Sequence, residues 1–130
     1  MDINSINPKW GEIWMCNLGT DYIGSIQGGR RPVFILSNDK NNKYSPNVNV
    51  MPLTTKMDKR RLPVHVELWN YEECGLKKPS TIMAESILTI SKDSLEYKMG
   101  QVSDGETLNK ICTAIGVQFA FIKMSHAGVQ

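Results

Sequence analysis

Short apolar segments alternate with clusters of Gly, Pro, Asn, Asp and Ser over most of this chain. Segments of this size bounded by turn-forming residues are typical of β-strands. The pattern is clearest in Val64-His-Val-Glu-Leu68, whose three apolar residues fall on one face of an extended chain, with His65 and Glu67 on the other. We therefore expect one face of this strand to be core and the other to be exposed or to line a site.

The same pattern predicts seven strands. They lie near Glu12–Leu18, Pro32–Leu36, Val48–Leu53, Val64–Leu68, Thr81–Ala84, Ile87–Ile90 and Glu96–Val102. Many short strands separated by turn signals indicate a small β-barrel or a sandwich. Because proline has no N–H to donate to a ladder, Pro52 predicts an edge position for its strand.

The hydrophobic period changes after Gln101. Apolar residues then recur at helical spacing, at Leu108, Ile111, Cys112, Ile115, Phe119 and Ile122. The preceding Ser103-x-x-Glu106 fits a capping box. We expect a helix over about 104–123, followed by a short tail, with Cys112 buried in the apolar stripe.

Length and composition favour one folded domain. The chain has 130 residues, of which 41% are hydrophobic, as in ordinary packed proteins. We expect a single domain over residues 1–130, mainly β with a C-terminal helix, in which residues of about 10–103 form the barrel.

Charge and cysteine content exclude several classes of protein. The net charge of +2 is too small to predict nucleic-acid binding by itself, so the distribution of the basic residues must decide. Cys16, Cys74 and Cys112 lack the spacing of a zinc site or a disulfide framework, so we expect no metal and no cofactor. With no secretory leader and no apolar run of about 20 residues, the sequence predicts a cytoplasmic protein without membrane contact.

The connection between the first two strands holds the most suggestive chemistry. Gly24-Ser-Ile-Gln-Gly-Gly-Arg-Arg-Pro32 contains three glycines that permit close backbone approach to a ligand. Arg31, held before the rigid Pro32, would present a planar fork of donors to a phosphate. This composition favours an anion-binding loop, and the alternative is an ordinary flexible connection.

A second basic segment follows the third strand. It contains Lys56, Lys59, Arg60 and Arg61. These residues would neutralise the phosphates of a single-stranded nucleic acid, with binding that weakens as salt rises. The alternative for each of them is a solvated hairpin tip.

Several motifs, in order, resemble those of the MazF/PemK toxin family. They are Gly11-Glu-Ile-Trp, Gln27-Gly-Gly-Arg-Arg-Pro-Val-Phe-Ile-Leu-Ser-Asn-Asp39, Tyr44-Ser-Pro46, Leu53-Thr54, Leu62-Pro-Val-His-Val-Glu67 and Thr81-Ile-Met-Ala-Glu85. The resemblance covers about Gly11 to Ser103 and rests on the whole series rather than on any one motif.

The resemblance implies an SH3-like small β-barrel of the MazF/CcdB toxin type, usually a homodimer. It implies the toxin of a type II toxin–antitoxin system: a metal-independent, sequence-selective endoribonuclease that cleaves single-stranded RNA by attack of the 2′-hydroxyl on the adjacent phosphate. The implied partner is a cognate, MazE-like antitoxin whose extended acidic segment covers the RNA groove and with which the toxin binds DNA.

The resemblance also assigns residues. The family's catalytic arginine and threonine fall on Arg31 and Thr54, and its RNA-contacting loop positions fall on Ser25 and Gln27. We extend the predicted RNA contacts to the neighbouring glycines, the basic segment and a strand histidine, which are Gly28, Gly29, Lys56, Lys59, Arg60, Arg61 and His65.

The proton-transfer roles stay open. An arginine pKa above about 12 favours an electrostatic role for Arg31, whereas the family scheme often gives this arginine acid or base duties. His65 titrates in the right range to be the base, and its alternative is a structural or exposed histidine.

Two departures from the family pattern leave alternative functions open. Many relatives carry an acidic residue where this chain has Ile26 and an arginine where it has Leu88. The alternatives are a non-enzymatic DNA gyrase poison resembling CcdB and an inactive SH3-like RNA-binding module. CcdB-like proteins rely on a tryptophan-containing C-terminal end, whereas this chain ends in Ala127-Gly-Val-Gln130.

Overall fold

The computed structural model describes residues 6–19, 29–57 and 60–122. Seven strands form its regular β-structure: β1 (Glu12–Asn17), β2 (Arg30–Ile35), β3 (Asn47–Thr54), β4 (His65–Leu68), β5 (Ser80–Met83), β6 (Leu88–Ser91) and β7 (Leu95–Gln101). All seven predicted strands are confirmed, each with bounds within two residues of those expected. Local alternation and turn residues were therefore sufficient to locate the strands.

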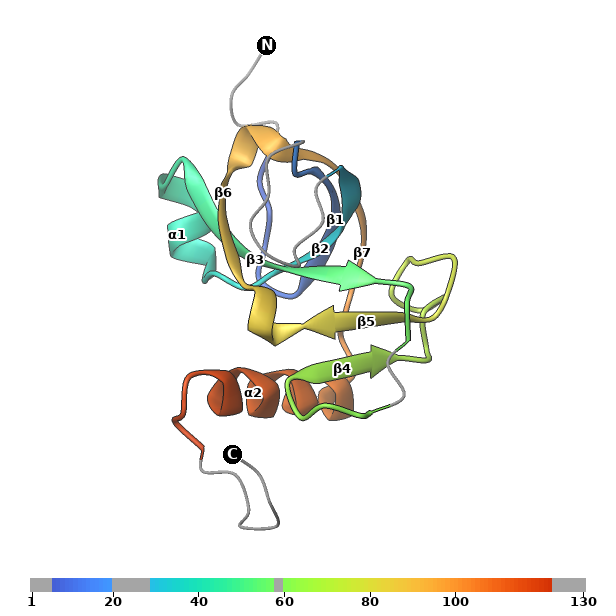
Figure 1. The fold of residues 1–130 in the computed structure, drawn as a ribbon. Coiled ribbons are helices and arrows are strands. Elements are labelled where there is room, and N and C mark those ends of the chain that lie inside the picture. Colours follow the sequence, from blue (N-terminus) through green and yellow to red (C-terminus); the bar gives the residue numbers. More distant parts are fainter. Residues whose placement is uncertain (1–5, 20–28, 58–59, 123–130) are drawn as a thin grey trace.

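The strands pair antiparallel in the order β4-β5-β3-β2-β1-β7, with β6 added on β3. Figure 1 shows β6, β3, β2, β1 and β7 curling into a barrel, while β5 and β4 extend the sheet away from it. Strand β6 runs into β7 through the short turn η3 (Lys92–Ser94), and no ladder joins β6 to β7 in the described residues. The mainly β fold with a C-terminal helix is confirmed, but the barrel is open along this seam.

Strand β3 lies at the centre of the sheet, so the predicted edge position of Pro52 is wrong. On one side β3 pairs with β2, with Pro52 opposite Val33. On the other side it pairs with β6 up to Val50 and with β5 from Leu53. Pro52 lies between these two ladders, where a missing N–H interrupts neither of them.

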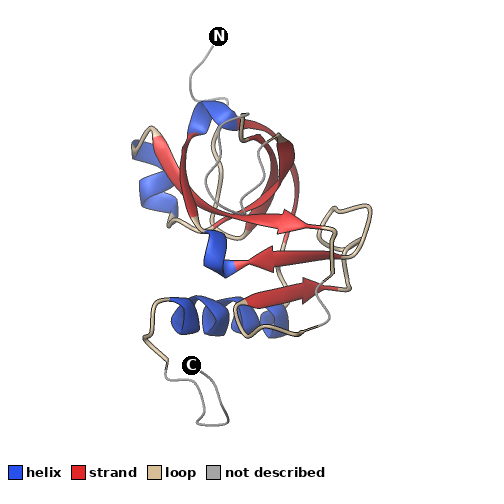
Figure 2. Ribbon diagram, viewed as in Figure 1, coloured by secondary structure: helices blue, strands red, loops and turns tan. Residues whose placement is uncertain are grey.

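Two apolar clusters fill the molecule. One lies inside the barrel and consists of Trp14, Cys16, Val33, Ile35, Val48, Val50 and Leu95. The other joins the sheet to helix α2 (Gly105–Gln118) and includes Ile13, Phe34, Met51, Leu53, Val66, Leu68, Ile82, Ile111 and Ala114. Figure 2 shows this helix running below β4, so it covers the end of the sheet that extends from the barrel.

Helix α2 begins one residue later than expected and has a different cap. The Asp104 side chain accepts hydrogen bonds from the backbone N–H of Thr107 at 2.9 Å and from its hydroxyl at 2.7 Å. These hydrogen bonds favour the charged carboxylate and lower the pKa of Asp104. Aspartate takes the N-cap, so the predicted box starting at Ser103 is wrong.

The helix also ends earlier than residue 123. Ala120 adopts a left-handed φ of 64°, and the N–H groups of Phe121 and Ile122 both donate to the Gly116 carbonyl, at 2.8 and 3.1 Å. This reversal satisfies the last carbonyl groups of the helix and folds Ile122 back onto it. A Cβ on Gly116 would lie 2.6 Å from the Cδ1 atom of Ile122, so a larger residue there would displace that side chain.

The buried face of α2 differs from the expected stripe. Of the expected residues Ile111 is buried, Leu108 and Ile115 are partly buried against the core, and Phe119 and Ile122 are exposed. Thr107, Ile111, Ala114 and Gly116 are buried, whereas Cys112 is exposed. The helix packs through a narrower face than the apolar residues suggested. No helix in the described part of the chain is long and apolar enough to cross a membrane.

The sequence did not predict the short helix α1 (Asp39–Tyr44). Its residues show no apolar stripe, and Asn38 caps it by accepting from the Asn41 N–H at 2.8 Å. The buried Asn42 side chain donates to the Ser37 carbonyl at 2.8 Å and accepts from its hydroxyl at 2.5 Å. Side-chain hydrogen bonds, rather than apolar burial, hold α1 in place.

Two glycines let the β4–β5 connection touch β7. A Cβ on Gly75 would lie 2.1 Å from the Met99 carbonyl oxygen, and one on Gly100 would lie 2.1 Å from the Cys74 carbonyl oxygen. Each clash is with backbone, which cannot move aside as the end of a side chain can. Only glycine allows this approach at either position.

We expect Gly100→Ala to lower the free energy of unfolding by about 2 kcal/mol because the new methyl group overpacks a backbone contact. Gly105→Ala, at the open start of α2, is the matched control and should be neutral or stabilising by about 0.5 kcal/mol. Urea midpoints at unchanged slope measure both. Equal stability of the two variants would contradict the close approach.

The cysteines differ in exposure. Cys16 and Cys74 are buried and Cys112 is exposed. Burial, assisted by the nearby Glu96 carboxylate, raises the pKa of Cys16 to about 12, and burial also raises that of Cys74. Because the thiolate is the reactive form, both buried thiols should be inert near neutral pH.

At pH 8 a thiol reagent should modify Cys112 rapidly and leave Cys16 and Cys74 unreacted until the protein unfolds. With a pKa of about 12, roughly one Cys16 in 10,000 is a thiolate at pH 8. Its reactivity should rise only as the pH approaches that value. Cys112→Ser should abolish the rapid phase, and a second rapid thiol in the folded protein would show that the burial is wrong.

Candidate active site

Arg31 and Thr54 come together where β2 begins and β3 ends. The β2–β3 register pairs Val33 with Pro52, and continuing it by two residues places Arg31 opposite Thr54. The Nη1 atom of Arg31 donates to the carbonyl oxygen of Leu53, the neighbour of Thr54, at 3.4 Å. Antiparallel pairing thus unites the two residues predicted to be catalytic, which are 23 positions apart in the sequence.

The Thr54 side chain is fixed by the turn that follows it. Thr54 is half-buried at the last position of β3, and its Oγ1 atom accepts from the Lys56 N–H at 3.1 Å. A hydroxyl accepts and donates at the same time, so its proton remains available to a ligand. The turn therefore orients the oxygen without using up its donor.

Polar side chains continue from this pair across the sheet. Thr54 is opposite Thr81 on β5, and Thr81 is opposite Glu67 on β4. Directly paired residues point to the same face of a sheet. Arg31, Thr54, Thr81 and Glu67 therefore form a polar row on one face, while Leu53, Ile82 and Val66 on the other face enter the core beside α2.

His65 lies on the same face but away from the Arg31–Thr54 pair. It lies on β4, opposite Met83 on β5. Strand β4 is two strands away from β3, which amounts to about 10 Å at ordinary strand spacing. Its Nε2 atom lies 2.6 Å from Oε2 of Glu85, and its side chain is 11% exposed. The prediction that His65 and Glu67 share one face of the strand is confirmed. The contact of His65 with Glu85 was not predicted, because only folding brings η2 (Ala84–Ser86) next to β4.

Backbone hydrogen bonds close the base of the glycine-rich loop. The Gly29 N–H donates to the Gly19 carbonyl at 2.6 Å, and the Gly29 carbonyl accepts from the Leu18 N–H at 2.9 Å. Gly29 has a φ of 83°, which favours glycine. The loop therefore leaves and re-enters the barrel two residues from Arg31. The predicted RNA contacts Ser25, Gln27 and Gly28 lie outside the described residues, as does Ile26.

The basic segment starts directly after Thr54. Lys56, Arg60 and Arg61 are exposed, and Lys59 lies outside the described residues. Arg61 has a left-handed φ of 54°, an uncommon conformation for a residue with a side chain. Positive charge is thus concentrated at the end of β3, where the polar row begins.

The Cys16 thiol lies on the strand beside Arg31 but does not fit a catalytic role. Cys16 is opposite Arg31 on β1, but its raised pKa keeps the buried thiol neutral, so it is no nucleophile near neutral pH. In the described ranges no three His, Cys, Asp or Glu side chains are grouped so as to hold a metal ion. The chemistry available at the site is a fixed cation beside a hydroxyl.

Comparisons with known proteins show the family to which the chain belongs. Residues 9–119 match the family model described as PemK-like, MazF-like toxin of type II toxin–antitoxin system. The chain is 35% identical to Endoribonuclease EndoA of Bacillus subtilis over 88% of its own length and 96% of the relative's. It is 37% identical to Endoribonuclease MazF of Staphylococcus saprophyticus over 82% of its own length and 87% of the relative's.

Solved structures show the same fold. A mycobacterial endoribonuclease in complex with its cognate antitoxin superposes with a TM-score of 0.70 at 28% identity, covering 90% of this chain and 99% of that one. The Mycobacterium tuberculosis toxin MazF-mt6 gives a TM-score of 0.69 at 26% identity, covering 84% and 96%. The chain belongs to the family of PemK-like, MazF-like toxins of type II toxin–antitoxin systems.

Proposed function

We propose that this chain is an endoribonuclease toxin that cuts single-stranded RNA at Arg31 and Thr54. The observation that carries the proposal is the Arg31 guanidinium held at the end of β3 beside the Thr54 hydroxyl. Two relatives that match most of the chain are named endoribonucleases. The basic segment starts directly after Thr54, so an RNA strand would meet further positive charge beside the cut.

The reaction suited to these residues uses the RNA's own nucleophile. The ribose 2′-oxygen forms a bond to the adjacent phosphorus, the bond from phosphorus to the 5′-oxygen breaks, and the products are a 2′,3′-cyclic phosphate and a 5′-hydroxyl. A base takes the 2′-proton, and the 5′-oxygen gains one. Because nucleophile and phosphate belong to one strand, binding has only to align them, and no metal-bound water is needed.

Arg31 and Thr54 act on the charge that develops on phosphorus. Negative charge grows on the non-bridging oxygens as the 2′-oxygen attacks, and fixed donors aimed at those oxygens lower the barrier. The Arg31 guanidinium offers a planar fork of N–H donors to these oxygens. The Thr54 hydroxyl adds a neutral donor. His65, two strands away and bonded to Glu85, is better placed to contact RNA than to move a proton at the cut.

The departure at Leu88 has a structural explanation. Leu88 opens β6 opposite Val50 and packs against the cluster inside the barrel. Its side chain supports the barrel where many relatives carry an arginine, so this chain lacks that charge near the RNA path. We expect altered sequence preference, with the Arg31–Thr54 centre unaffected.

The proposed partners bind the surface formed by the basic segment and the Arg31–Thr54 pair, which we call the basic groove. A mycobacterial relative was solved with its cognate antitoxin. We propose that this chain, as a cytoplasmic homodimer, is inhibited by a MazE-like antitoxin whose acidic segment covers the basic groove. Toxin and antitoxin together would bind DNA. A CcdB-like gyrase poison would not require Arg31 beside Thr54, and an inactive RNA-binding module would bind RNA without cutting it.

The purified protein should cut a long unstructured RNA at a recurring short sequence in excess EDTA, leaving 5′-hydroxyl ends. Arg31→Ala and Thr54→Ala should each lower the cleavage rate by about 100-fold or more, as expected for loss of a transition-state donor. Primer extension maps the ends. Arg31→Lys keeps the charge but not the fork and should recover only part of the rate.

Arg30→Ala is the matched control for the arginine. Arg30 is the adjacent residue, and its Nη2 atom forms an ion pair with Oε1 of Glu96 at 2.6 Å. Cleavage should persist in this variant. Cutting that is unchanged in Arg31→Ala, or RNA left intact by the wild type while gyrase-bound DNA is trapped, would refute the proposed function.

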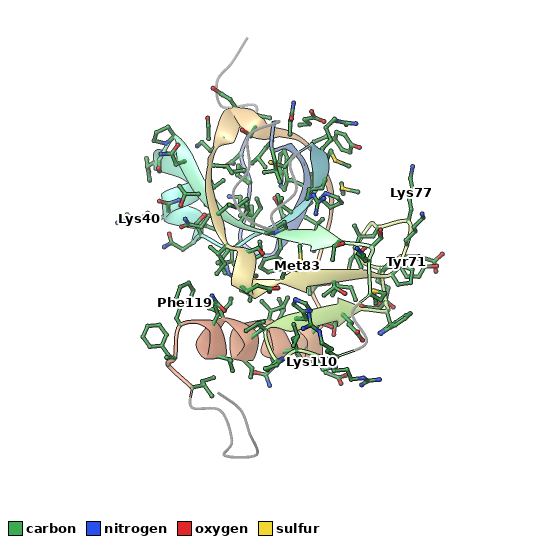
Figure 3. The ribbon with its side chains drawn as sticks, in the orientation of Figure 1. Lys40, Tyr71, Lys77, Met83, Lys110 and Phe119 are labelled. Atoms are coloured by element: carbon green, nitrogen blue, oxygen red, sulfur yellow. The ribbon has the colours of Figure 1, made fainter. Side chains whose placement is uncertain are left out.

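RNA binding should weaken with salt in proportion to the phosphates contacted. Lys56→Gln and Arg61→Gln should each reduce the slope of log affinity against log salt by about 0.7, the value for one phosphate of a single strand. Lys77→Gln is the control, since Figure 3 shows Lys77 pointing outward from the β4–β5 connection. Filter binding to an RNA with a 2′-deoxy group at the cut measures the slopes. Equal slopes in all three variants would show that the basic segment does not contact RNA phosphates.

A further inference from the structure

A cleft of about 670 Å³ lies between β4 and α2. Its walls come from the end of the basic segment, from the polar face of β4 and from one side of the helix. The residues used below are Arg61, Glu67, Trp69 and Lys110. Figure 3 shows Lys110 on α2 where the helix passes below β4.

The cleft begins on the same face of the sheet as the candidate active site. Glu67 lines the cleft and is also the last member of the polar row that begins at Arg31. Three strand spacings separate the two residues, which is about 15 Å. Thr81, between them, is buried and donates to the sulfur of Met57, so a strand that leaves the Arg31–Thr54 centre toward the cleft would pass over these two side chains.

Trp69 is an exposed aromatic side chain held in one orientation. It is 62% exposed, and its Nε1 atom donates to Oε1 of Glu67 at 3.0 Å. By contrast, Trp14 is buried and Trp10 packs edge-on against Phe34. A fixed indole with an uncovered surface is the kind of group on which an unpaired base stacks.

Two basic side chains line the same cleft as the indole and its Glu67 partner. Arg61 comes from the basic segment and Lys110 from α2. Lys110 has an ion pair with Glu106 at 3.8 Å, but both side chains are largely exposed, so the pair is weak and leaves the ammonium group available to a phosphate. An exposed aromatic surface in a cleft with two cations suits a nucleotide, whose base can stack while its phosphate meets a positive charge.

We propose that this cleft is a subsite for the RNA that flanks the cut, in which Trp69 stacks on a base and Arg61 and Lys110 hold phosphates. The proposal rests on the proposed function for the identity of its ligand. Glu67 acts as a positioning residue, because it fixes the indole. The subsite would select substrates that extend beyond the cleaved bond on one side.

The test uses RNA oligonucleotides centred on the mapped cut and shortened one nucleotide at a time from each end. For the wild type, kcat/KM should fall by about 5- to 150-fold when the stacked nucleotide is removed or made abasic, the range expected for one base on an aromatic side chain. Trp69→Ala should show the same loss on the long substrate and no further loss on the abasic one. Trp69→Phe should retain most of the activity.

The control is Tyr44→Ala, which removes an aromatic side chain of 72% exposure from α1, well away from β4 in Figure 1. Its kcat/KM should match the wild type on every substrate. In Trp69→Ala, KM should rise on the long substrate while kcat on the shortest cleavable one is unchanged, which general damage to the fold would not produce.

Binding separates this inference from the proposed function. With an oligonucleotide made non-cleavable by a 2′-deoxy group at the cut, tryptophan fluorescence should be quenched in the wild type and not in Trp69→Phe. Cleavage that is indifferent to Trp69 and to abasic flanks overturns the subsite and leaves the nuclease. Quenching through Trp69 without any cleavage overturns the nuclease and leaves the subsite, and the absence of both overturns both.

Discussion

Strand β3 is the element on which the rest of the structure depends. It pairs with β2 along one side and, along the other, with β6 in its first half and β5 in its second. Its outward continuation past Pro52 takes the sheet out of the barrel and onto α2. The same strand ends at Thr54, so the change of partner that builds the fold also delivers a hydroxyl to the beginning of β2.

The candidate active site is formed where the end of β3 faces the beginning of β2. A guanidinium and a hydroxyl at facing strand ends are held by the ladder behind them, not by a mobile loop, and rigid elements position catalytic groups more accurately. The loop that begins and ends near Arg31 is closed at its base by Gly19 and Gly29, which fixes where it leaves the barrel. Charge from the basic segment follows at once, so electrostatic attraction and the reacting groups occupy one region.

One face of the β3–β5–β4 sheet forms core and the other carries the polar residues of the site. Leu53, Ile82 and Val66 bury one face against α2, which stabilises the extension from the barrel. The other face carries the polar row from Arg31 to Glu67 and opens into the cleft beside Trp69. Because side chains alternate along a strand, a slip of one residue in register would exchange core and site, so packing and function are specified together.

The sequence by itself determined the seven strands and the existence of the final helix, and the family resemblance singled out Arg31 and Thr54 as candidate catalytic residues. Strand patterns are local, because alternation and turn residues act over a few positions. Tertiary structure alone decided the partners of β3 and thus the central place of Pro52, the Asp104 cap, the exposure of Cys112 and the contact of His65 with Glu85. Each of these depends on which distant segment packs against the residue, and no local period encodes that choice. The cleft at Trp69 is of the same kind, since its two walls are joined only when α2 docks below β4.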